Sequence, residues 1–305
     1  MTTQSFHPVA PSGLAKFSLF ARDIKISHTV FAMPWALLSM VLAGKITAGK
    51  VVLILICMVT ARTAAMASNR LLDARLDAAN PRTRRRAIPA GLLTRRFYLL
   101  ALLGCCAIFM ATCAAFWQLY SNPWPIALAL PVLVFISAYP LLKRFTRLCH
   151  YYLGAALGLA PICAWVAIGG RLALPPLLMA AAVLCWTAGF DIIYACQDFE
   201  CDIAENLHSI PSRMGIARGL WISRITHAAS AGFMIALWLT TPQFHAAFAG
   251  GVAAAIVLLI IEHWLVRPTD LRNVGLAFFT LNGIISVLLG GLGIIDVLLS
   301  GAMKS

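Results

Sequence analysis

The sequence predicts an all-α polytopic membrane protein, and three observations support that fold class. Hydrophobic residues make up 61% of the 305 residues and charged residues only 11%, whereas a soluble domain carries roughly 25% charged residues. Apolar stretches recur at the length of about 20 residues that a helix needs to cross the hydrocarbon. The alternation typical of a membrane β-barrel is absent. Disordered, coiled-coil, disulfide-rich secreted and soluble nucleic-acid-binding proteins are therefore excluded.

Nine stretches are long and apolar enough to be read as spans. In chain order they are expected at 26–44, 50–68, 97–119, 124–142, 151–170, 174–194, 219–241, 245–265 and 274–299. The residues through Gly13 lack the basic start and apolar core of a signal peptide, so we expect no cleavage. We interpret 1–305 as one membrane domain, with an N-terminal segment at 1–23 and a nine-helix bundle at 24–299.

The distribution of Lys and Arg residues over the connections tests this order of spans, because alternate connections lie on opposite sides of the membrane. The N-terminal segment and the second-to-third, fourth-to-fifth, sixth-to-seventh and eighth-to-ninth connections hold 19 of the 24 Lys and Arg residues, against four on the opposite side. Cytoplasmic loops carry the excess of Lys and Arg. We therefore expect a multi-pass protein with its N-terminus in the cytoplasm and its C-terminus on the opposite side. Without an evident organellar transit peptide, the bacterial inner (plasma) membrane is the expected location.

Carboxylates are scarce, and they are concentrated in two short segments. Seven of the eleven acids lie within 73–77 and 191–205, at the expected cytoplasmic ends of the second and sixth spans. A charge near lipid costs on the order of 2.5–3.5 kcal/mol on insertion scales, so such acids usually face a bundle interior or a watery cavity. They could also be ordinary interfacial loop charges, but their spacing favours a site.

The first acidic segment places Asn69, Asp73 and Asp77 four residues apart. On a continuous helix this spacing puts all three on one face, and Arg62 falls within about 20° of Asn69 on that face. A buried arginine in a span is costly, so Arg62 is either a substrate contact or part of an internal ion pair.

The second acidic segment repeats the pattern as Tyr194, Asp198 and Asp202, at a constant offset of 125 residues from the first. We interpret the two segments as a degenerate internal duplication. Paired carboxylates offer the hard oxygen ligands that suit Mg²⁺, an ion that keeps several waters and is shared with substrate phosphates. Arg and Lys of the flanking loops would neutralise the remaining phosphate charge.

On these motifs the sequence resembles the UbiA superfamily of intramembrane aromatic prenyltransferases. Members of that family carry NxxxDxxxD on the second helix and YxxxDxxxD on the sixth helix of a nine-helix bundle. The stretch YPLLKRFT, which begins at Tyr139, also resembles the family's YPxxKRxT stretch. Segments beginning at Ile24 and His208 look most like the 4-hydroxybenzoate polyprenyltransferase subgroup. That subgroup includes a menaquinone branch, whose acceptor is a dihydroxynaphthoate.

The resemblance implies Mg²⁺-dependent transfer of a polyprenyl group from an allylic diphosphate to an aromatic acid in ubiquinone or menaquinone biosynthesis. The metal would be bound by the four motif acids, which are Asp73, Asp77, Asp198 and Asp202. Asn69 would support the ion or the diphosphate, and Lys143 and Arg144 would grip the diphosphate. Tyr194 belongs to the second motif and is assigned to substrate binding with it.

The aromatic acid needs an anchor for its carboxylate, and the candidates are Lys25, His28 and Arg62. Lys25 and His28 share a helix face, although Lys25 could be only a topology charge and His28 only a satisfied histidine. Asp191 is expected to orient the ring or accept a proton, or else to pair with a basic residue. Tyr139 is expected to support the isoprenoid, or else to belong to the interfacial aromatic belt.

Two other functions compete with this interpretation. An ion-coupled transporter also carries intramembrane acids and internal repeats, but its acids lie near the midplane. Another member of the superfamily could use a different acceptor. The expected partners are the two substrates and the lipid bilayer, with no nucleic acid, and the oligomeric state is left open.

Overall fold

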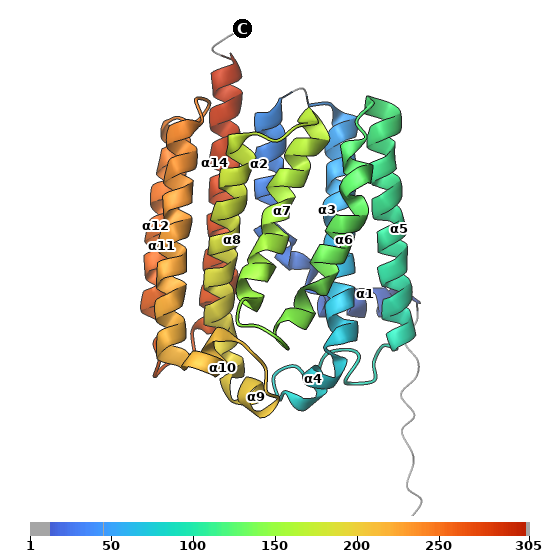
Figure 1. The fold of residues 1–305 in the computed structure, drawn as a ribbon, viewed down its shortest axis with the longest axis vertical. Coiled ribbons are helices and arrows are strands. Elements are labelled where there is room, and N and C mark those ends of the chain that lie inside the picture. Colours follow the sequence, from blue (N-terminus) through green and yellow to red (C-terminus); the bar gives the residue numbers. More distant parts are fainter. Residues whose placement is uncertain (1–12, 45, 303–305) are drawn as a thin grey trace, which may run out of the picture.

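The computed structural model describes residues 13–44 and 46–302, with the side chains of residues 27, 28, 30, 301 and 302 left out. Within these residues the chain forms helices and no strand, which confirms the all-α fold class (Figure 1). The helices that build the bundle are α2 (Met33–Ala43), α3 (Ala48–Leu72), α5 (Arg95–Tyr120), α6 (Trp124–Leu142), α7 (Cys149–Gly169), α8 (Leu174–Ala195), α11 (Ile216–Thr240), α12 (Ala246–Leu265) and α14 (Asn282–Ala302).

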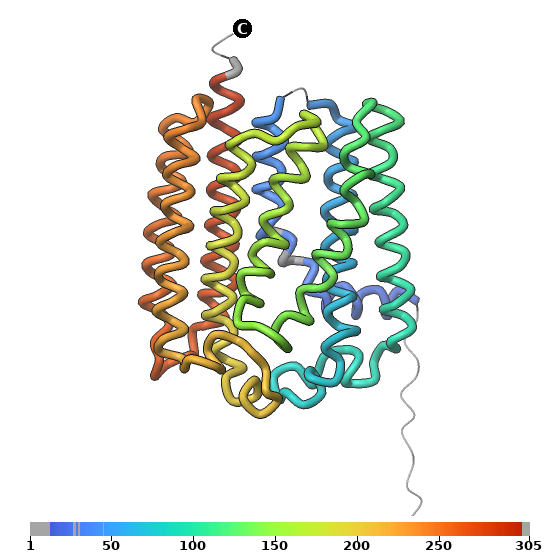
Figure 2. The backbone as a smooth tube through the Cα atoms, viewed as in Figure 1, coloured from blue at the N-terminus to red at the C-terminus, as the bar shows by residue number. Residues whose placement is uncertain are grey.

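Short helices cap or lead into these long ones. They are α1 (Gly13–Asp23), the 3₁₀ helices η1 (Ile26–Phe31) and η2 (Cys196–Asp198), α4 (Ala74–Ala79), α9 (Phe199–Ala204), α10 (Ile210–Met214), α13 (Val274–Leu276) and the π-helix η3 (Ala277–Leu281). Helices α4, α9 and α10 lie at the same end of the bundle (Figure 1), here called the polar end. Figure 2 shows the loops next to α4 and α9 meeting at this end.

Eight helices of the described residues are long and apolar enough to cross a membrane, so the predicted count of nine is approximate. The first predicted span, 26–44, is divided into η1 and the short helix α2. Pro34 is the reason, because proline has no N–H and its ring clashes with a preceding helical turn. Proline is tolerated in a first turn, and α2 accordingly begins at Met33. Helix α2 packs between α7 and α14.

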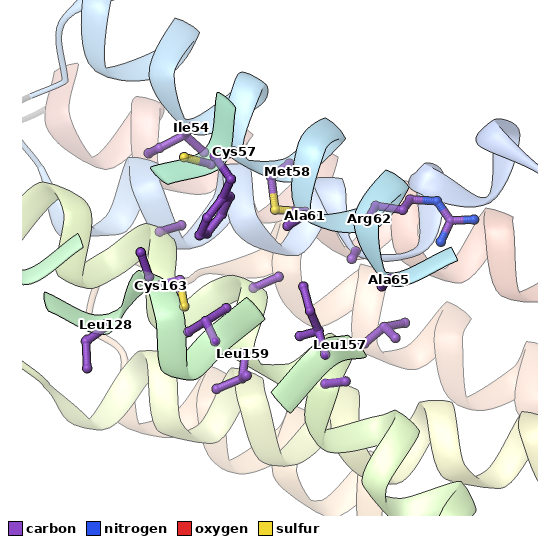
Figure 3. Close-up of a pocket in the computed structure, with 18 of the residues that line it drawn as sticks. Ile54, Cys57, Met58, Ala61, Arg62, Ala65, Leu128, Leu157, Leu159 and Cys163 are labelled. Carbon is purple, nitrogen blue, oxygen red and sulfur yellow. The ribbon is translucent and has the colours of Figure 1, made fainter. Parts of the chain in front are cut away.

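The two halves of the bundle are filled differently. Large side chains of α2, α8, α11, α12 and α14 pack together in one half, among them the buried Trp35, Trp186 and Phe248. In the other half, α3, α5, α6 and α7 surround a cavity of about 190 Å³ with an almost wholly apolar lining (Figure 3). We call this space the apolar chamber. The half formed by α3, α5, α6 and α7 therefore leaves room for a long apolar ligand.

Helices α7 and α8 approach each other closely at two glycines. A Cβ atom at Gly154 would lie 2.3 Å from the backbone oxygen of Leu184, and one at Gly158 would lie 2.8 Å from that of Ala180. Small residues four apart allow this kind of close backbone packing between membrane helices. The contact fixes α7 against the part of α8 that leads to the second acidic motif.

Helix α1 lies across the long helices rather than along them (Figure 1). Its last residue, Asp23, has a side chain that is only 7% exposed. This carboxylate accepts hydrogen bonds from Arg70 Nε at 3.1 Å, from the Ala87 N–H at 3.0 Å and from the Tyr98 hydroxyl. Because a buried carboxylate is stable only when it is paired and hydrogen-bonded, this cluster ties α1 to the end of α3 that carries the first motif.

Candidate active site

The two acidic motifs bend at equivalent positions. Asp73 separates α3 from α4 with φ −92° and ψ 3°, and Asp198 ends η2 before α9 with φ −100° and ψ 8°. The prediction of one continuous helix face was therefore wrong at both sites. Asp is a poor residue for a helix interior, because its side chain competes for backbone groups. The N–H groups of Asp73 and Asp77 still bond the carbonyl oxygens four residues before them, which preserves the spacing.

Both motifs line one pocket of about 250 Å³ at the polar end. The predicted site residues that line this pocket are Lys25, Arg62, Asn69, Asp73, Asp77, Tyr139, Lys143, Asp191, Tyr194, Asp198 and Asp202. Arg144 reaches the site through its contact with Asp73, and the His28 side chain lies outside the described residues. A neighbouring hollow of about 160 Å³ is shared by both motifs, Lys143 and Asp191.

The carboxylate of Asp73 is held by two cations and one amide. Lys143 Nζ lies 2.7 Å from one oxygen and Arg144 Nη2 lies 3.2 Å from the other. Asn69 donates from Nδ2 to Asp73 at 3.1 Å, while its own Oδ1 accepts from Arg70. Since Arg70 can only donate and Asp73 only accept when ionised, the Asn69 amide has one orientation. In this arrangement Asn69 aims its N–H groups at Asp73.

The loop after the first motif reaches across to the second motif. Asn80 Nδ2 donates to Asp198 at 2.7 Å, and Arg82 donates to the same carboxylate from Nε at 2.9 Å and from Nη2. Arg82 also donates to the Tyr194 hydroxyl at 2.7 Å. Burial lowers the pKa of the Arg82 guanidinium, but the hydrogen bonds to Asp198 and the attraction of Asp198, Tyr194 and Asp77 together raise the pKa above its usual value. These contacts join the motifs into one site.

The remaining motif acids lie on the two short helices. Asp77 on α4 accepts two hydrogen bonds from Arg86, at 2.7 and 2.9 Å. Asp202 on α9 interacts with the side chain of Ser209. Arg86, Arg82 and Asn80 therefore complete the polar site. Sequence reasoning named the arginines of this loop only as a group and missed Asn80, although its place three residues after Asp77 was a usable signal.

The donor set fits Mg²⁺ better than a metal that is fully enclosed by protein. No three His, Cys, Asp or Glu side chains of the described residues lie close enough to hold a metal by themselves. Mg²⁺ is typically bound through one or two carboxylates, with waters and substrate phosphates completing the octahedron. Carboxylate oxygens on two sides of one pocket offer that kind of partial coordination.

Arg62 lies where the pocket meets the apolar chamber and lines both spaces. Its guanidinium points away from the apolar chamber (Figure 3) and donates from Nη2 to the Lys25 carbonyl at 2.9 Å. Among the described residues its buried Nε has no hydrogen-bond partner. Lys25 has φ 50° at the start of η1 and extends Nζ to 5.9 Å from the Tyr194 ring centre. Two cations therefore lie beside the aromatic part of the pocket.

Aromatic rings from three elements cover one side of this pocket. Phe278 of the π-helix η3 lies with its ring centre 4.2 Å from that of Tyr194 and 5.2 Å from that of Phe190. Phe31 of η1 packs against Phe190 at 5.7 Å. Such a surface excludes water, and its ring faces stabilise a nearby cation. Sequence analysis did not assign these phenylalanines to the site.

Asp191 is paired with a residue that sequence reasoning missed. His150, at the start of α7, places Nδ1 2.7 Å from Asp191 Oδ2. The sequence left open whether Asp191 lines the site or pairs with a basic residue, and the structure shows both. No local pattern marks His150, because it is one polar residue at the edge of an apolar stretch.

Comparison with known proteins places this architecture in a family. The sequence profile of the UbiA prenyltransferase family matches residues 32–284. A 4-hydroxybenzoate octaprenyltransferase of Edwardsiella ictaluri is 29% identical, over 83% of this chain and 86% of the relative. Another of that name, from Tolumonas auensis, is 30% identical over 68% of this chain and 70% of the relative.

Solved structures agree with these sequence matches. The apo structure of a UbiA homologue from Aeropyrum pernix K1 has a TM-score of 0.80 and 30% identity, over 89% of this chain and 98% of its own. A UbiA homologue from Archaeoglobus fulgidus bound to DMAPP and Mg²⁺ has a TM-score of 0.68 and 19% identity, over 91% and 98% of the two chains. The second match shows the shared fold alone.

Proposed function

The chain belongs to the UbiA prenyltransferase family and is a membrane-embedded prenyltransferase, and we propose that it prenylates 4-hydroxybenzoate from a polyprenyl diphosphate with Mg²⁺. One observation carries the proposal: the acid-lined pocket and the apolar chamber adjoin. Arg62, Met66, Tyr139, Leu153 and Leu157 line both. A diphosphate bound at the acids would place its isoprenoid tail in the apolar chamber.

The site's residues match the demands of the reaction. Asp73, Asp77, Asp198 and Asp202 would hold Mg²⁺, which supplies Lewis-acid stabilisation of the diphosphate. Lys143, Arg144 and Arg82 offer fixed positive charge to the same leaving group. The allylic C–O bond breaks with its electron pair leaving on the diphosphate. The acceptor ring then attacks the allylic carbon through its carbon ortho to the hydroxyl, and that ring carbon releases its proton. The phenylalanines beside Tyr194 keep water from the allylic cation.

We also propose the orientation of the protein in the bacterial inner membrane. The polar end, which carries the arginine-rich loop after α4, would face the cytoplasm, because cytoplasmic loops hold the excess of Lys and Arg. The N-terminus would then be cytoplasmic, and the described end of α14, which lies at the opposite end (Figure 1), would face the other side. Acids at one end of the bundle rather than at its midplane do not favour a transporter.

A direct assay tests the proposed activity. The purified protein in lipid nanodiscs is given geranyl diphosphate, Mg²⁺ and either 4-hydroxybenzoate or 1,4-dihydroxy-2-naphthoate, and products are identified by mass spectrometry. We expect geranylated 4-hydroxybenzoate. If only the naphthoate gives a product, the acceptor is that of the menaquinone branch and not 4-hydroxybenzoate. If neither acid gives a product, the proposal is contradicted.

Arg62→Leu is expected to raise the KM for 4-hydroxybenzoate by about tenfold, because it removes a charge-assisted contact of roughly 1.5–3 kcal/mol to the acceptor carboxylate. The KM for the diphosphate should stay unchanged. Arg171→Leu, at an exposed position of the opposite end, is the matched control. Equal KM values for Arg62→Leu and wild type would remove Arg62 from acceptor binding.

Cys163→Phe is expected to restrict the donor to short chains, because Cys163 on α7 lines the apolar chamber (Figure 3) and a phenyl ring would fill part of it. The kcat/KM for farnesyl or longer diphosphates should fall by about tenfold while that for dimethylallyl diphosphate is retained, a loss of roughly 1.4 kcal/mol. Cys106→Phe, on α5 outside the lining, should change neither value. A uniform loss for all donors would argue against a tail site there.

A further inference from the structure

His150 is buried at the start of α7, with a relative exposure of 2%, and both of its ring nitrogens are engaged. Nδ1 lies 2.7 Å from Asp191 Oδ2, and Nε2 lies 3.1 Å from the backbone nitrogen of Ile210. Ile210 is the first residue of α10, and the first N–H groups of a helix have no partner within it. His150 thus connects the start of α10 to Asp191 on α8.

These contacts fix the tautomer of the imidazole. The Ile210 backbone N–H can only donate, so Nε2 must accept. The ring hydrogen therefore lies on Nδ1 and is donated to the Asp191 carboxylate. A flipped ring would place carbon atoms against both partners, so the network determines a single ring orientation.

Asp191 is placed differently from the acids of the first motif. Asp73 and Asp77 bind lysine or arginine, whereas Asp191 is held by one imidazole N–H. Its side chain stays 24% exposed while that of His150 is only 3% exposed, and it lines both the 250 Å³ pocket and the 160 Å³ hollow. The Asp191 carboxylate is therefore fixed in position by His150 and still accessible from the pocket, which suits it to accept a proton.

Close helix packing explains why the pair can form. The contacts of Gly154 and Gly158 with the α8 backbone bring α7 and α8 together on the way to the polar end, where His150 faces Asp191. The loop before α7 is also attached to the loop before α10, because the His208 N–H donates to the Lys143 carbonyl at 2.6 Å. The position of the imidazole is therefore fixed by α8 through Asp191 and by α10 through Ile210.

We propose that Asp191 accepts the proton that the acceptor ring releases, and that His150 is the positioning residue that aims this carboxylate. The inference rests on the proposed function. In the step, the prenyl C1–O bond breaks and its electron pair leaves with the diphosphate, while the ring carbon ortho to the hydroxyl bonds to C1. The C–H bond at that carbon then breaks, its electron pair restores the aromatic ring, and the proton passes to Asp191, giving a carboxylic acid.

Two substitutions of His150 separate positioning from packing. His150→Gln keeps one N–H donor and one acceptor, whereas His150→Leu has a comparable volume and neither. We expect His150→Leu to lower kcat by about tenfold with the KM for the diphosphate unchanged, and His150→Gln to retain most of the activity. The expected loss is smaller than the 10²–10⁴-fold contribution of general acid–base catalysis, because His150 only positions the base.

The deciding readout is the isotope effect with 4-hydroxybenzoate deuterated ortho to the hydroxyl. Weakening the base makes C–H cleavage limit turnover, so His150→Leu and Asp191→Asn should show a larger primary isotope effect on kcat than wild type or His150→Gln. Asp191→Asn keeps an acceptor for Nδ1 and tests the base even where His150→Leu does not fold. Adding His150→Leu to Asp191→Asn should cause little further loss, because both act through one carboxylate.

Three outcomes would overturn the inference: wild-type kcat for His150→Leu, an unchanged isotope effect in Asp191→Asn, or fully additive losses in the double variant. The proposed function fails in a different way, because the wild-type protein would then yield no prenylated 4-hydroxybenzoate at all. Unfolding temperatures of the variants show whether any loss of kcat reflects lost structure.

Discussion

Asp198→Asn is expected to lower kcat by about a thousandfold or more at saturating Mg²⁺. The substitution keeps the size of the side chain but removes the charge that faces Arg82 at the second motif. Metal coordination contributes several kcal/mol of transition-state charge stabilisation, and each 1.36 kcal/mol is a factor of ten in rate. The measurement is steady-state formation of prenylated 4-hydroxybenzoate.

Asp270→Asn is the matched control, because Asp270 lies in the loop after α12, outside the pocket, and pairs there with Arg272. It should retain wild-type turnover. Chelation of divalent cations should reduce the wild-type protein to the level of Asp198→Asn, and added Mg²⁺ should restore it. Turnover that persists in chelator, or in Asp198→Asn, would remove the metal from the mechanism.

The fold class and the acid motifs could be predicted because both depend on local chemistry. Apolar stretches must form helices in lipid, since every backbone polar group has to be satisfied internally. The constant offset between Asp73 and Asp198 identified equivalent positions without any knowledge of contacts. The break at Pro34 could also have been anticipated, but the length of the apolar stretch outweighed it in the prediction of the first span.

The partners of the acids could not be predicted, because they depend on how distant segments pack. Arg82 and Asp198 are 116 residues apart and His150 and Asp191 are 41 apart, and no local pattern joins either pair. The apolar chamber is a similar case. Helices of both halves are apolar, so the sizes of the facing side chains decide which half is tightly packed and which contains the apolar chamber.

Mg²⁺ and the prenyl diphosphate are expected to bind cooperatively, each raising the affinity of the other by about 5–150-fold, the usual range of coupling between sites. In this structure three motif acids already have cationic partners: Asp73 with Lys143 and Arg144, Asp77 with Arg86, and Asp198 with Arg82. A metal ion alone must displace these side chains from the carboxylates. A diphosphate alone must bring its charge close to acids that no metal neutralises.

When both ligands bind, Mg²⁺ is expected to replace the lysine and arginine side chains at the carboxylates. Those basic side chains would then be free to bind the phosphates. Calorimetric titration of Mg²⁺ with and without geranyl thiolodiphosphate, a donor analogue that ionises slowly, measures the coupling. Arg82→Gln should tighten the binding of Mg²⁺ alone and reduce the coupling, because it frees Asp198 of its cation. Arg84→Gln, exposed in the same loop, should leave both unchanged. Equal Mg²⁺ affinities in the two titrations would mean that these ion pairs do not compete with the metal.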